Sequence, residues 1–203
     1  MAEKNPIVTI EMESGAIMKA ELYPEIAPNT VRNFIKLINE GYYNGLTFHR
    51  VEEELIQGGD KAGDGTGETE YSIEGEFSVN GHKENTLKFE RGTLGLARQD
   101  FTMYYYYTGD ESYLERGYNS GCTQFFITAE DCSEHFDGYY CAFGKVIEGM
   151  EIVDQIKAIE TTTETDEETG ETENTTTPVN PPVITSMTVD TFGIKYNEPK
   201  MIK

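Results

Sequence analysis

The sequence predicts a mainly β protein, folded as a closed antiparallel barrel whose ends are capped by two α-helices. Three observations predict this class. Short runs of alternating or β-branched residues recur along the 203 residues, and each run is bounded by Gly, Asn or Asp. Only two segments carry the helical period of apolar residues. Closing the sheet on itself also removes exposed strand edges, which could otherwise pair with other chains.

The chain begins with two strand candidates, PIVTIEM at residues 6–12 and AIMKAELY at residues 16–23. Both alternate polar and apolar residues, because successive side chains on a strand point to opposite faces. Ser14 and Gly15 stand between them as a tight turn. We therefore expect a half-buried antiparallel hairpin.

Residues 27–43 change to the helical period. Their apolar side chains Val31, Phe34, Ile35 and Ile38 fall at i, i+3, i+4 and i+7. Asn29 or Thr30 is expected to cap the start of this helix, and Gly41 to close its end. These residues therefore predict one amphipathic helix that lies on the sheet.

The remaining elements follow a strong turn signal at Asn44-Gly45. A second helix, residues 149–159, places Ile152, Val153, Ile156 and Ile159 on one side. The other strand candidates are all short and bounded by turn residues: LTFHRV (46–51), LIQGGD (55–60), TLGLAR (93–98), TQFFIT (123–128), YCAFGKVI (140–147) and VITSMTVD (183–190).

Residues 1–203 are expected to form a single domain. Two segments belong neither to the strands of the predicted barrel nor to its two helices. Residues 99–119 concentrate Phe and Tyr in a connection, which predicts either a local hairpin that covers its own apolar side or a flap beside a binding groove. Residues 160–177 are acidic, rich in Thr and Glu and nearly free of apolar side chains. They predict a mobile surface loop, since burial cannot offset their ordering entropy.

Composition restricts the partners. Lys and Arg number 16 and Asp and Glu 37, so the formal net charge is -21, which disfavours nucleic acid and anionic membranes. The N-terminus alternates from the start, and no window has the apolar run of a signal peptide or membrane span, so we expect a cytoplasmic protein. Three cysteines without C-x-x-C spacing fit reduced structural thiols.

Other chemistry is poorly supported. In DKAGDGTGE, Ala62 and Tyr71 stand where a calcium loop needs oxygen ligands, and no Lys-Ser or Lys-Thr completes a phosphate-binding loop. A glycine-rich turn is the better interpretation. The three histidines show no metal-ligand spacing, and Cys132 with His135 lies in one polar connecting run, unlike a nucleophile and its base. We expect neither metal nor cofactor.

Six blocks in order resemble the cyclophilin family of peptidyl-prolyl cis-trans isomerases: FHR, QGGD, GTLGLAR, TQFFIT, FDGYYCAFGKVIEGMEIVD and VITSMTVDTFG. They cover nearly the whole chain. The resemblance implies a closed eight-stranded antiparallel barrel with a helix at each end. It also implies isomerisation of X-Pro bonds in flexible or unfolded polypeptides during folding, without a cofactor. We expect a monomer that binds proline-containing peptides.

The resemblance assigns roles to particular residues. Arg50 matches the family's catalytic arginine, whose N–H would localise the lone pair of the prolyl nitrogen and restore single-bond character. Gln57 and Gln124 would position the peptide, and Ala97 and Arg98 would offer it backbone groups. The positions expected to form or border the proline pocket are Phe48, His49, Leu55, Ile56, Phe126, His135, Phe136 and Tyr140. Phe126 and Phe136 could also be plain core residues, and the glutamines could satisfy buried backbone groups.

One departure from the family pattern bears on activity. VEEELIQ, residues 51–57, is one residue shorter than usual and lacks the Pro-Gly turn and the aromatic residue that follow the arginine in the family. We hypothesise that one of Glu52, Glu53 and Glu54 bends back to pair with Arg50. A catalytically weak module that binds proline-containing segments is therefore an alternative to an active isomerase. A third reading has residues 160–177 recruit a basic partner.

Overall fold

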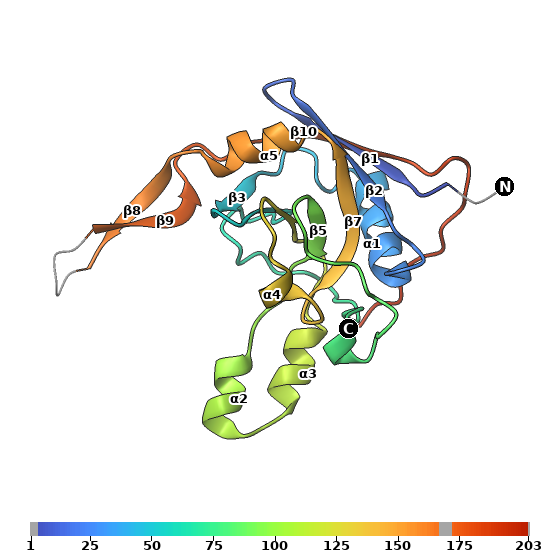
Figure 1. Cartoon of the computed structure of the whole chain (residues 1–203), viewed down its shortest axis with the longest axis vertical. Helices are drawn as coiled ribbons and strands as arrows, with labels where there is room; N and C mark the ends of the chain where they lie inside the picture. The colour runs from blue at the N-terminus through green and yellow to red at the C-terminus, as the bar shows by residue number, and fades with distance from the viewer. Residues whose placement is uncertain (1–3, 167–171, 203) are drawn as a thin grey trace.

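The computed structural model describes residues 4–166 and 172–202 and shows a mainly β architecture (Figure 1). Eight strands form one antiparallel sheet in the order β10-β1-β2-β7-β5-β6-β4-β3. All eight correspond to the predicted strands: β1 Ile7–Met12, β2 Ile17–Leu22, β3 Phe48–Val51, β4 Leu55–Gly58, β5 Thr93–Leu96, β6 Phe125–Thr128, β7 Cys141–Glu148 and β10 Ile184–Asp190. Alternation bounded by turn residues was thus sufficient to find them.

The predicted closure of the barrel is not confirmed. The sheet curls into a half-barrel, and its edge strands β3 and β10 are not paired as neighbours. The chain just before each strand forms an isolated antiparallel bridge, Thr47 with Val183. The amide of Phe48 also donates to the carbonyl of Pro182 at 3.0 Å. These two contacts tie the edges of the sheet together without a ladder between β3 and β10.

The two predicted helices are α1, Pro28–Asn39, and α5, Met150–Lys157. The start of α1 differs from the prediction, because neither Asn29 nor Thr30 caps it with its own side chain. The buried carboxylate of Glu76 accepts hydrogen bonds from the amides of Asn29 and Thr30, at 3.0 and 2.7 Å, and from the Thr30 hydroxyl at 2.8 Å. An acid at this end also complements the helix dipole.

The main core lies between α1 and the curled sheet. The ring of Phe34 on α1 packs against Phe125 of β6 and Phe143 of β7, with ring centroids 5.3 and 5.1 Å apart. The predicted apolar positions Val31, Ile35 and Ile38 are buried as well. The helix therefore holds β6 and β7, two strands that also border the site described below.

Residues 99–119 form two short helices, α2 Thr102–Thr108 and α3 Ser112–Tyr118, which project from the body as a helical hairpin (Figure 1). A further short helix, α4 Ser133–Phe136, and the 3₁₀ turn η1 Ser78–Asn80 bring the helical content of the described chain above the two capping helices that were predicted. Short helices escape periodicity because they complete at most two turns.

Residues 160–177 form a two-stranded ribbon where the sequence predicted a mobile loop. It consists of β8 Thr161–Thr165 and β9 Thr172–Pro178 and projects from a different side of the body than the helical hairpin does (Figure 1). Cross-strand threonine hydroxyls pair at 2.6 Å between Thr162 and Thr175, which supports the ribbon without burial. Residues 167–171 of the predicted loop lie outside the described residues.

Cys122, Cys132 and Cys141 are free and buried, as the sequence predicted. Burial raises the pKa of the Cys141 thiol to about 12. Within residues 4–166 and 172–202, no helix has the length and apolar character needed to cross a membrane.

Candidate active site

Arg50 lies on β3 and is held by two neighbours on the same hairpin. Its Nε and Nη2 atoms donate to Glu52 Oε1 at 2.9 and 2.5 Å, and Nη1 donates to Gln57 Oε1 at 2.9 Å. The guanidinium has five N–H donors, and these contacts use three of them. Two N–H groups of the fork are therefore left for another acceptor, and the hypothesised pairing with a glutamate is present through Glu52.

A chain of amides continues from Arg50 across the sheet. Gln57 pairs in register with Arg50 of β3 on one side and with Phe126 of β6 on the other. Gln57 Nε2 donates to Gln124 Oε1 at 2.8 Å, and Gln124 Nε2 donates to the carbonyl of Gly65 at 3.1 Å. In each glutamine the side-chain oxygen and nitrogen are bonded to different neighbours. These bonds fix the orientation of both amide groups as well as their positions.

The glycine-rich turn after β4 is shaped by a buried acid. Asp60 is 2% exposed, and its Oδ2 accepts the amides of Asp64 and Gly65 at 3.2 and 2.9 Å. Gly59 has a φ of +89°, and a β-carbon there would lie 2.5 Å from the carbonyl oxygen of Thr123, so glycine is required. The turn thereby brings Gly65 against Gln124.

An apolar cluster separate from the main core adjoins the amide chain. Phe126 lies at its centre, with the rings of Phe89, Phe136 and Tyr140 at centroid distances of 5.5, 5.5 and 5.7 Å. The cluster has a buried floor and a partly exposed rim, composed respectively of Leu55, Phe89, Phe126, Cys132 and Ala142, and of Leu87, Ala97, Phe136 and Tyr140. It offers an apolar ring such as that of proline an aromatic surface next to Arg50 and Gln57.

Gly95 allows this cluster to form. It pairs with Phe126 across β5 and β6, and a β-carbon at Gly95 would stand 2.2 Å from Phe126 Cζ. The aromatic ring therefore occupies the space above β5 that a side chain at position 95 would fill. A larger residue there would force Phe126 out of its place.

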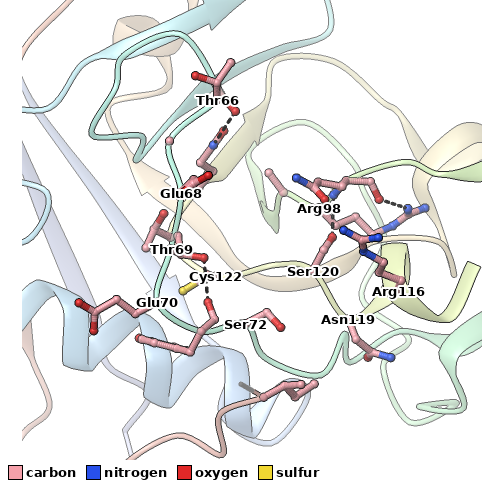
Figure 2. A pocket seen from close by; sticks show the side chains of 18 of the residues that line it. Thr66, Glu68, Thr69, Glu70, Ser72, Arg98, Arg116, Asn119, Ser120 and Cys122 are labelled. Atoms are coloured by element: carbon pink, nitrogen blue, oxygen red, sulfur yellow. Dashed lines mark hydrogen bonds between the residues drawn. The ribbon is translucent and has the colours of Figure 1, made fainter. Parts of the chain in front are cut away.

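A cavity of about 930 Å³ lies beside the amide chain, on the side away from Arg50. Figure 2 shows one wall formed by the segment from Thr66 to Ser72 and the opposite wall carrying Arg98, Arg116, Asn119 and Ser120. Gln57, Ala97 and Gln124 line it as well, so the cavity and the apolar cluster share Ala97. We refer to the cavity and the adjoining rim of the apolar cluster together as the groove.

The structure gathers most of the predicted site residues along this groove. Arg50, Gln57, Gln124, Leu55, Phe126, Phe136, Tyr140, Ala97 and Arg98 lie along it. His135 is exposed on α4, next to Phe136. Phe48 and Ile56 are fully buried in the main core, so packing replaces the predicted contact of their side chains with substrate.

The backbone amide of Ala97 is not free for substrate, and the side chain of Arg98 has a further role. The amide of Ala97 donates to the carbonyl of Gln124 at 3.0 Å and is engaged within the protein. The Arg98 side chain donates from Nε to the carbonyl of Tyr139 at 3.0 Å, and its guanidinium lies 4.5 Å from the centroid of the Tyr140 ring. Arg98 therefore also braces the rim of the apolar cluster, a role that the sequence did not indicate.

His49 is the one predicted site residue with an unusual electrostatic environment. It is 4% exposed, and neither ring nitrogen has a hydrogen-bond partner among the described residues. Burial lowers the pKa of His49, against the opposing influence of Asp60. The imidazole is thus kept neutral beneath the groove, and a role in contacting substrate is not supported by its position.

The stability of the protein is expected to fall between pH 7.5 and 5.5 in part because of His49. A histidine whose pKa is lowered by folding binds its proton only in the unfolded chain, so stability is lost as pH falls through the unfolded value of about 6.5. The slope contributed is at most about 1.4 kcal/mol per pH unit. Urea unfolding at pH 7.5, 6.5 and 5.5 will show a shallower slope for His49→Gln than for the native chain. The exposed His135→Gln is the control and should retain the native slope; equal slopes for all three proteins would contradict the assignment.

Two contributors to the site were missed from the sequence. Phe89 stacks on Phe126 with an angle of 20° between the rings, and it comes from a connection that is neither strand nor helix in the structure. Arg116 of α3 reaches the cavity from the helical hairpin. Alternation of Leu87 and Phe89 was the available signal for the first. Arg116 had none, because its position depends on how the hairpin folds.

The comparisons with known proteins all point to one family. The family model described as cyclophilin type peptidyl-prolyl cis-trans isomerase/CLD matches residues 7–189. Peptidyl-prolyl cis-trans isomerase B of Bacillus subtilis is 40% identical over 141 residues, which are 69% of this chain and 82% of that protein. A peptidyl-prolyl cis-trans isomerase of Helicobacter pylori strain J99 is 34% identical over 157 residues, 76% of this chain and 82% of the relative.

Solved structures give the same match. The crystal structure of a cyclophilin-type peptidyl-prolyl cis-trans isomerase of Cryptosporidium parvum superposes with a TM-score of 0.68 at 25% identity and covers 92% of this chain and 98% of that one. A second structure of that protein, in the presence of the dipeptide Ala-Pro, gives a TM-score of 0.66 at 25% identity over 91% of this chain and 98% of that one.

Proposed function

The chain belongs to the cyclophilin-type peptidyl-prolyl cis-trans isomerase family, and we propose that it isomerises X-Pro bonds by a hydrogen bond from Arg50 to the prolyl nitrogen. Its substrates are flexible or unfolded polypeptides, whose folding it assists. The proline ring packs on Phe126 between Leu55, Phe136 and Tyr140. The flanking residues extend along the groove past Gln57 and Gln124.

The single observation that carries the proposal is the orientation of Arg50. Gln57 holds one side of its guanidinium at 2.9 Å, directly beside the apolar cluster around Phe126. A donor held in this way loses little entropy when it meets substrate. It can form its strongest bond to a pyramidal prolyl nitrogen, which exists only when the amide is twisted, and so it favours the transition state over both planar isomers.

Arg50 and the groove must both contribute to lowering the rotation barrier. The barrier to rotation is about 18–20 kcal/mol, and lowering it by about 5.5 kcal/mol accelerates the reaction about ten thousandfold. A charge-assisted hydrogen bond contributes about 1.5–3 kcal/mol. The rest must come from the groove, which holds the twisted amide against an apolar wall with much of the water excluded. No proton transfer is needed, and we propose a monomeric enzyme of the cytoplasm that requires no cofactor.

The direct test is the cis-to-trans relaxation of a short X-Pro peptide. Uncatalysed relaxation takes tens of seconds or longer at 25 °C, so catalysis is readily measured after a solvent jump. We expect the protein at micromolar concentration to accelerate it in proportion to its concentration. Binding of the peptide without any acceleration would support the second candidate, a module that grips proline segments, and would refute the isomerase.

The specific observation that favours weak catalysis is the bond between Arg50 and Glu52. The carboxylate occupies two N–H groups of the guanidinium and partly neutralises its charge, while both side chains remain partly exposed, at 42% and 28%. A pair of this kind is worth about 1 kcal/mol at most. Release of Arg50 is therefore expected to strengthen its bond to the prolyl nitrogen and to raise activity.

Replacing Glu52 by glutamine is expected to raise kcat/KM on a short X-Pro peptide about fivefold. This factor corresponds to about 1 kcal/mol of transition-state stabilisation, and it should appear mainly in kcat, since the freed N–H groups act on the twisted amide. Glu53→Gln is the matched control, because Glu53 is exposed on the same turn and is expected to leave kcat/KM unchanged. An unchanged rate for Glu52→Gln, and for Glu52, Glu53 and Glu54 all replaced by alanine, would show that the pair does not restrain catalysis.

A further inference from the structure

Helix α2 exposes more apolar surface than the fold requires. Met103, Tyr106 and Tyr107, which we call the tyrosine face, are 59%, 73% and 82% exposed, and Tyr104 beside them is 57% exposed. Contiguous apolar patches of this kind on a soluble protein commonly mark an interaction site. The exposure of the tyrosine face therefore indicates an interaction site.

The hairpin does not need the tyrosine face in order to fold. Its inner side is packed by Phe101, Tyr104 and Tyr113, with the Tyr104 and Tyr113 rings stacked at 5.6 Å and Phe101 at 5.8 and 6.5 Å from them. Arg116 lies over the Phe101 ring at 5.1 Å. Among the tyrosine face residues, only Tyr106 has a ring contact in the described structure, with Tyr105 at 5.7 Å. The outward side chains can thus be replaced without removing this packing.

The hairpin is continuous with the groove. Its second helix, α3, contributes Ser112, Glu115 and Arg116 to the cavity that ends at Gln57 and Gln124. Figure 2 shows Arg116 and Asn119 on the same wall as Arg98 and Ser120. A polypeptide lying in the cavity would therefore leave the groove along the hairpin, and the tyrosine face stands on its outer helix.

The charges around the hairpin indicate which kind of molecule would bind to the tyrosine face. Residues 99–119 carry four acids, Asp100, Asp110, Glu111 and Glu115, against one cation, Arg116, and Arg98 directly precedes them. The whole chain carries a net charge of -21. An anionic lipid surface would be repelled. A flexible polypeptide with apolar and basic residues has the complementary character.

We propose that the tyrosine face is a second docking site for unfolded polypeptide, which holds residues distant from the proline while the X-Pro bond lies in the groove. Tyrosine rings present a large contact area with few rotamers and so lose little entropy on binding, and aromatic surfaces also accept proline-rich segments. Binding at two linked sites raises the effective concentration of the proline at the groove. This inference rests on the proposed function, because it extends the same substrate beyond the catalytic groove.

The experiment compares a short and a long substrate. The variant carries Met103→Gln, Tyr106→Gln and Tyr107→Gln, since glutamine retains helix propensity. The short substrate is a proline-containing tetrapeptide, and the long one is an unfolded protein whose refolding is limited by a prolyl isomerisation. We expect kcat/KM for the long substrate to fall about tenfold, mainly through KM, and kcat/KM for the tetrapeptide to stay within twofold.

A control replaces three other exposed apolar residues, Ile17→Thr, Ile147→Thr and Val179→Thr, whose side chains are 49%, 48% and 47% exposed. This control should behave as the native chain on both substrates. Equal losses on both substrates in the variant, or no loss on either, would overturn the proposal. A change in sedimentation from dimer to monomer with no effect on the long substrate would overturn it too and would assign the face to self-association.

Failure of the proposed function is distinguishable from failure of this inference. If the native chain accelerates neither substrate, fluorescence anisotropy with a labelled, permanently unfolded polypeptide still measures docking. Loss of that binding in the glutamine variant, and its retention in the threonine control, would support the tyrosine face. Equal binding by both would overturn it.

Discussion

Replacing Arg50 by alanine is expected to lower kcat/KM for X-Pro isomerisation about 100-fold. Removal of one preorganised donor to a developing charge costs about two orders of magnitude in rate, which corresponds to about 2.7 kcal/mol. Arg50 is the group that meets the prolyl nitrogen in the proposed mechanism, and Gln57 orients it at 2.9 Å. The loss should appear in kcat for a tetrapeptide, because the bond is strongest in the twisted state.

The fold should tolerate this change. The Arg50 side chain is 42% exposed, so its removal creates no cavity in the core. Arg50→Lys is expected to lose about tenfold, because lysine keeps the charge but lacks the fork that contacts Gln57 and substrate together. Arg32→Ala on α1 is a charge-matched control, because Arg32 lines a different hollow, beside Glu74 and Glu76, and it should keep native activity. Native activity in Arg50→Ala, with unfolding unchanged, would remove the arginine from the mechanism.

Replacing Glu76 by alanine is expected to lower the free energy of unfolding by about 3 kcal/mol. The carboxylate accepts hydrogen bonds from the amides of Asn29 and Thr30 and from the Thr30 hydroxyl. All three donors are buried, and a buried donor left without a partner costs about 1–3 kcal/mol. Urea unfolding followed by far-ultraviolet circular dichroism measures this difference.

Two variants separate the carboxylate from a general effect of its segment. Glu76→Gln retains one acceptor oxygen and is expected to lose about half as much. Glu74→Ala lies two residues away, has an exposed side chain, and should change stability by less than about 0.5 kcal/mol. If Glu76→Ala and Glu74→Ala unfold at the same urea concentration, the start of α1 does not depend on the buried acid.

Much of the fold was predictable because its signals are local. β1 and β2 alternate polar and apolar residues, the other strands of the sheet are short runs with apolar residues, and α1 repeats its apolar residues over three turns. The two insertions were located but not folded by the same reasoning. Residues 99–119 proved to be two helices too short for a clear period, and residues 160–177 gain a ribbon from threonine pairs and backbone ladders, which require no apolar pattern.

The candidate site, too, was predicted only in part from the sequence. From the sequence came the order of the strands along the chain and the resemblance to one family. That resemblance predicted that Arg50, Gln57, Gln124 and Phe126 act together. It also raised the hypothesis that one of Glu52, Glu53 and Glu54 turns back on Arg50. Glu52 occupies that position at 2.5 Å.

Which of the predicted residues border the groove depended on the tertiary structure. Phe48, His49 and Ile56 lie on the same two strands as Arg50, yet Phe48 and Ile56 pack in the main core and His49 lies against the glycine turn. Leu55 is as buried as His49, but it belongs to the floor of the apolar cluster. Phe89, Arg116 and the Glu76 cap are brought to their partners from distant segments. Local pattern fixes which way a side chain points relative to its own strand or helix; what it then meets is set by packing between segments far apart in the chain.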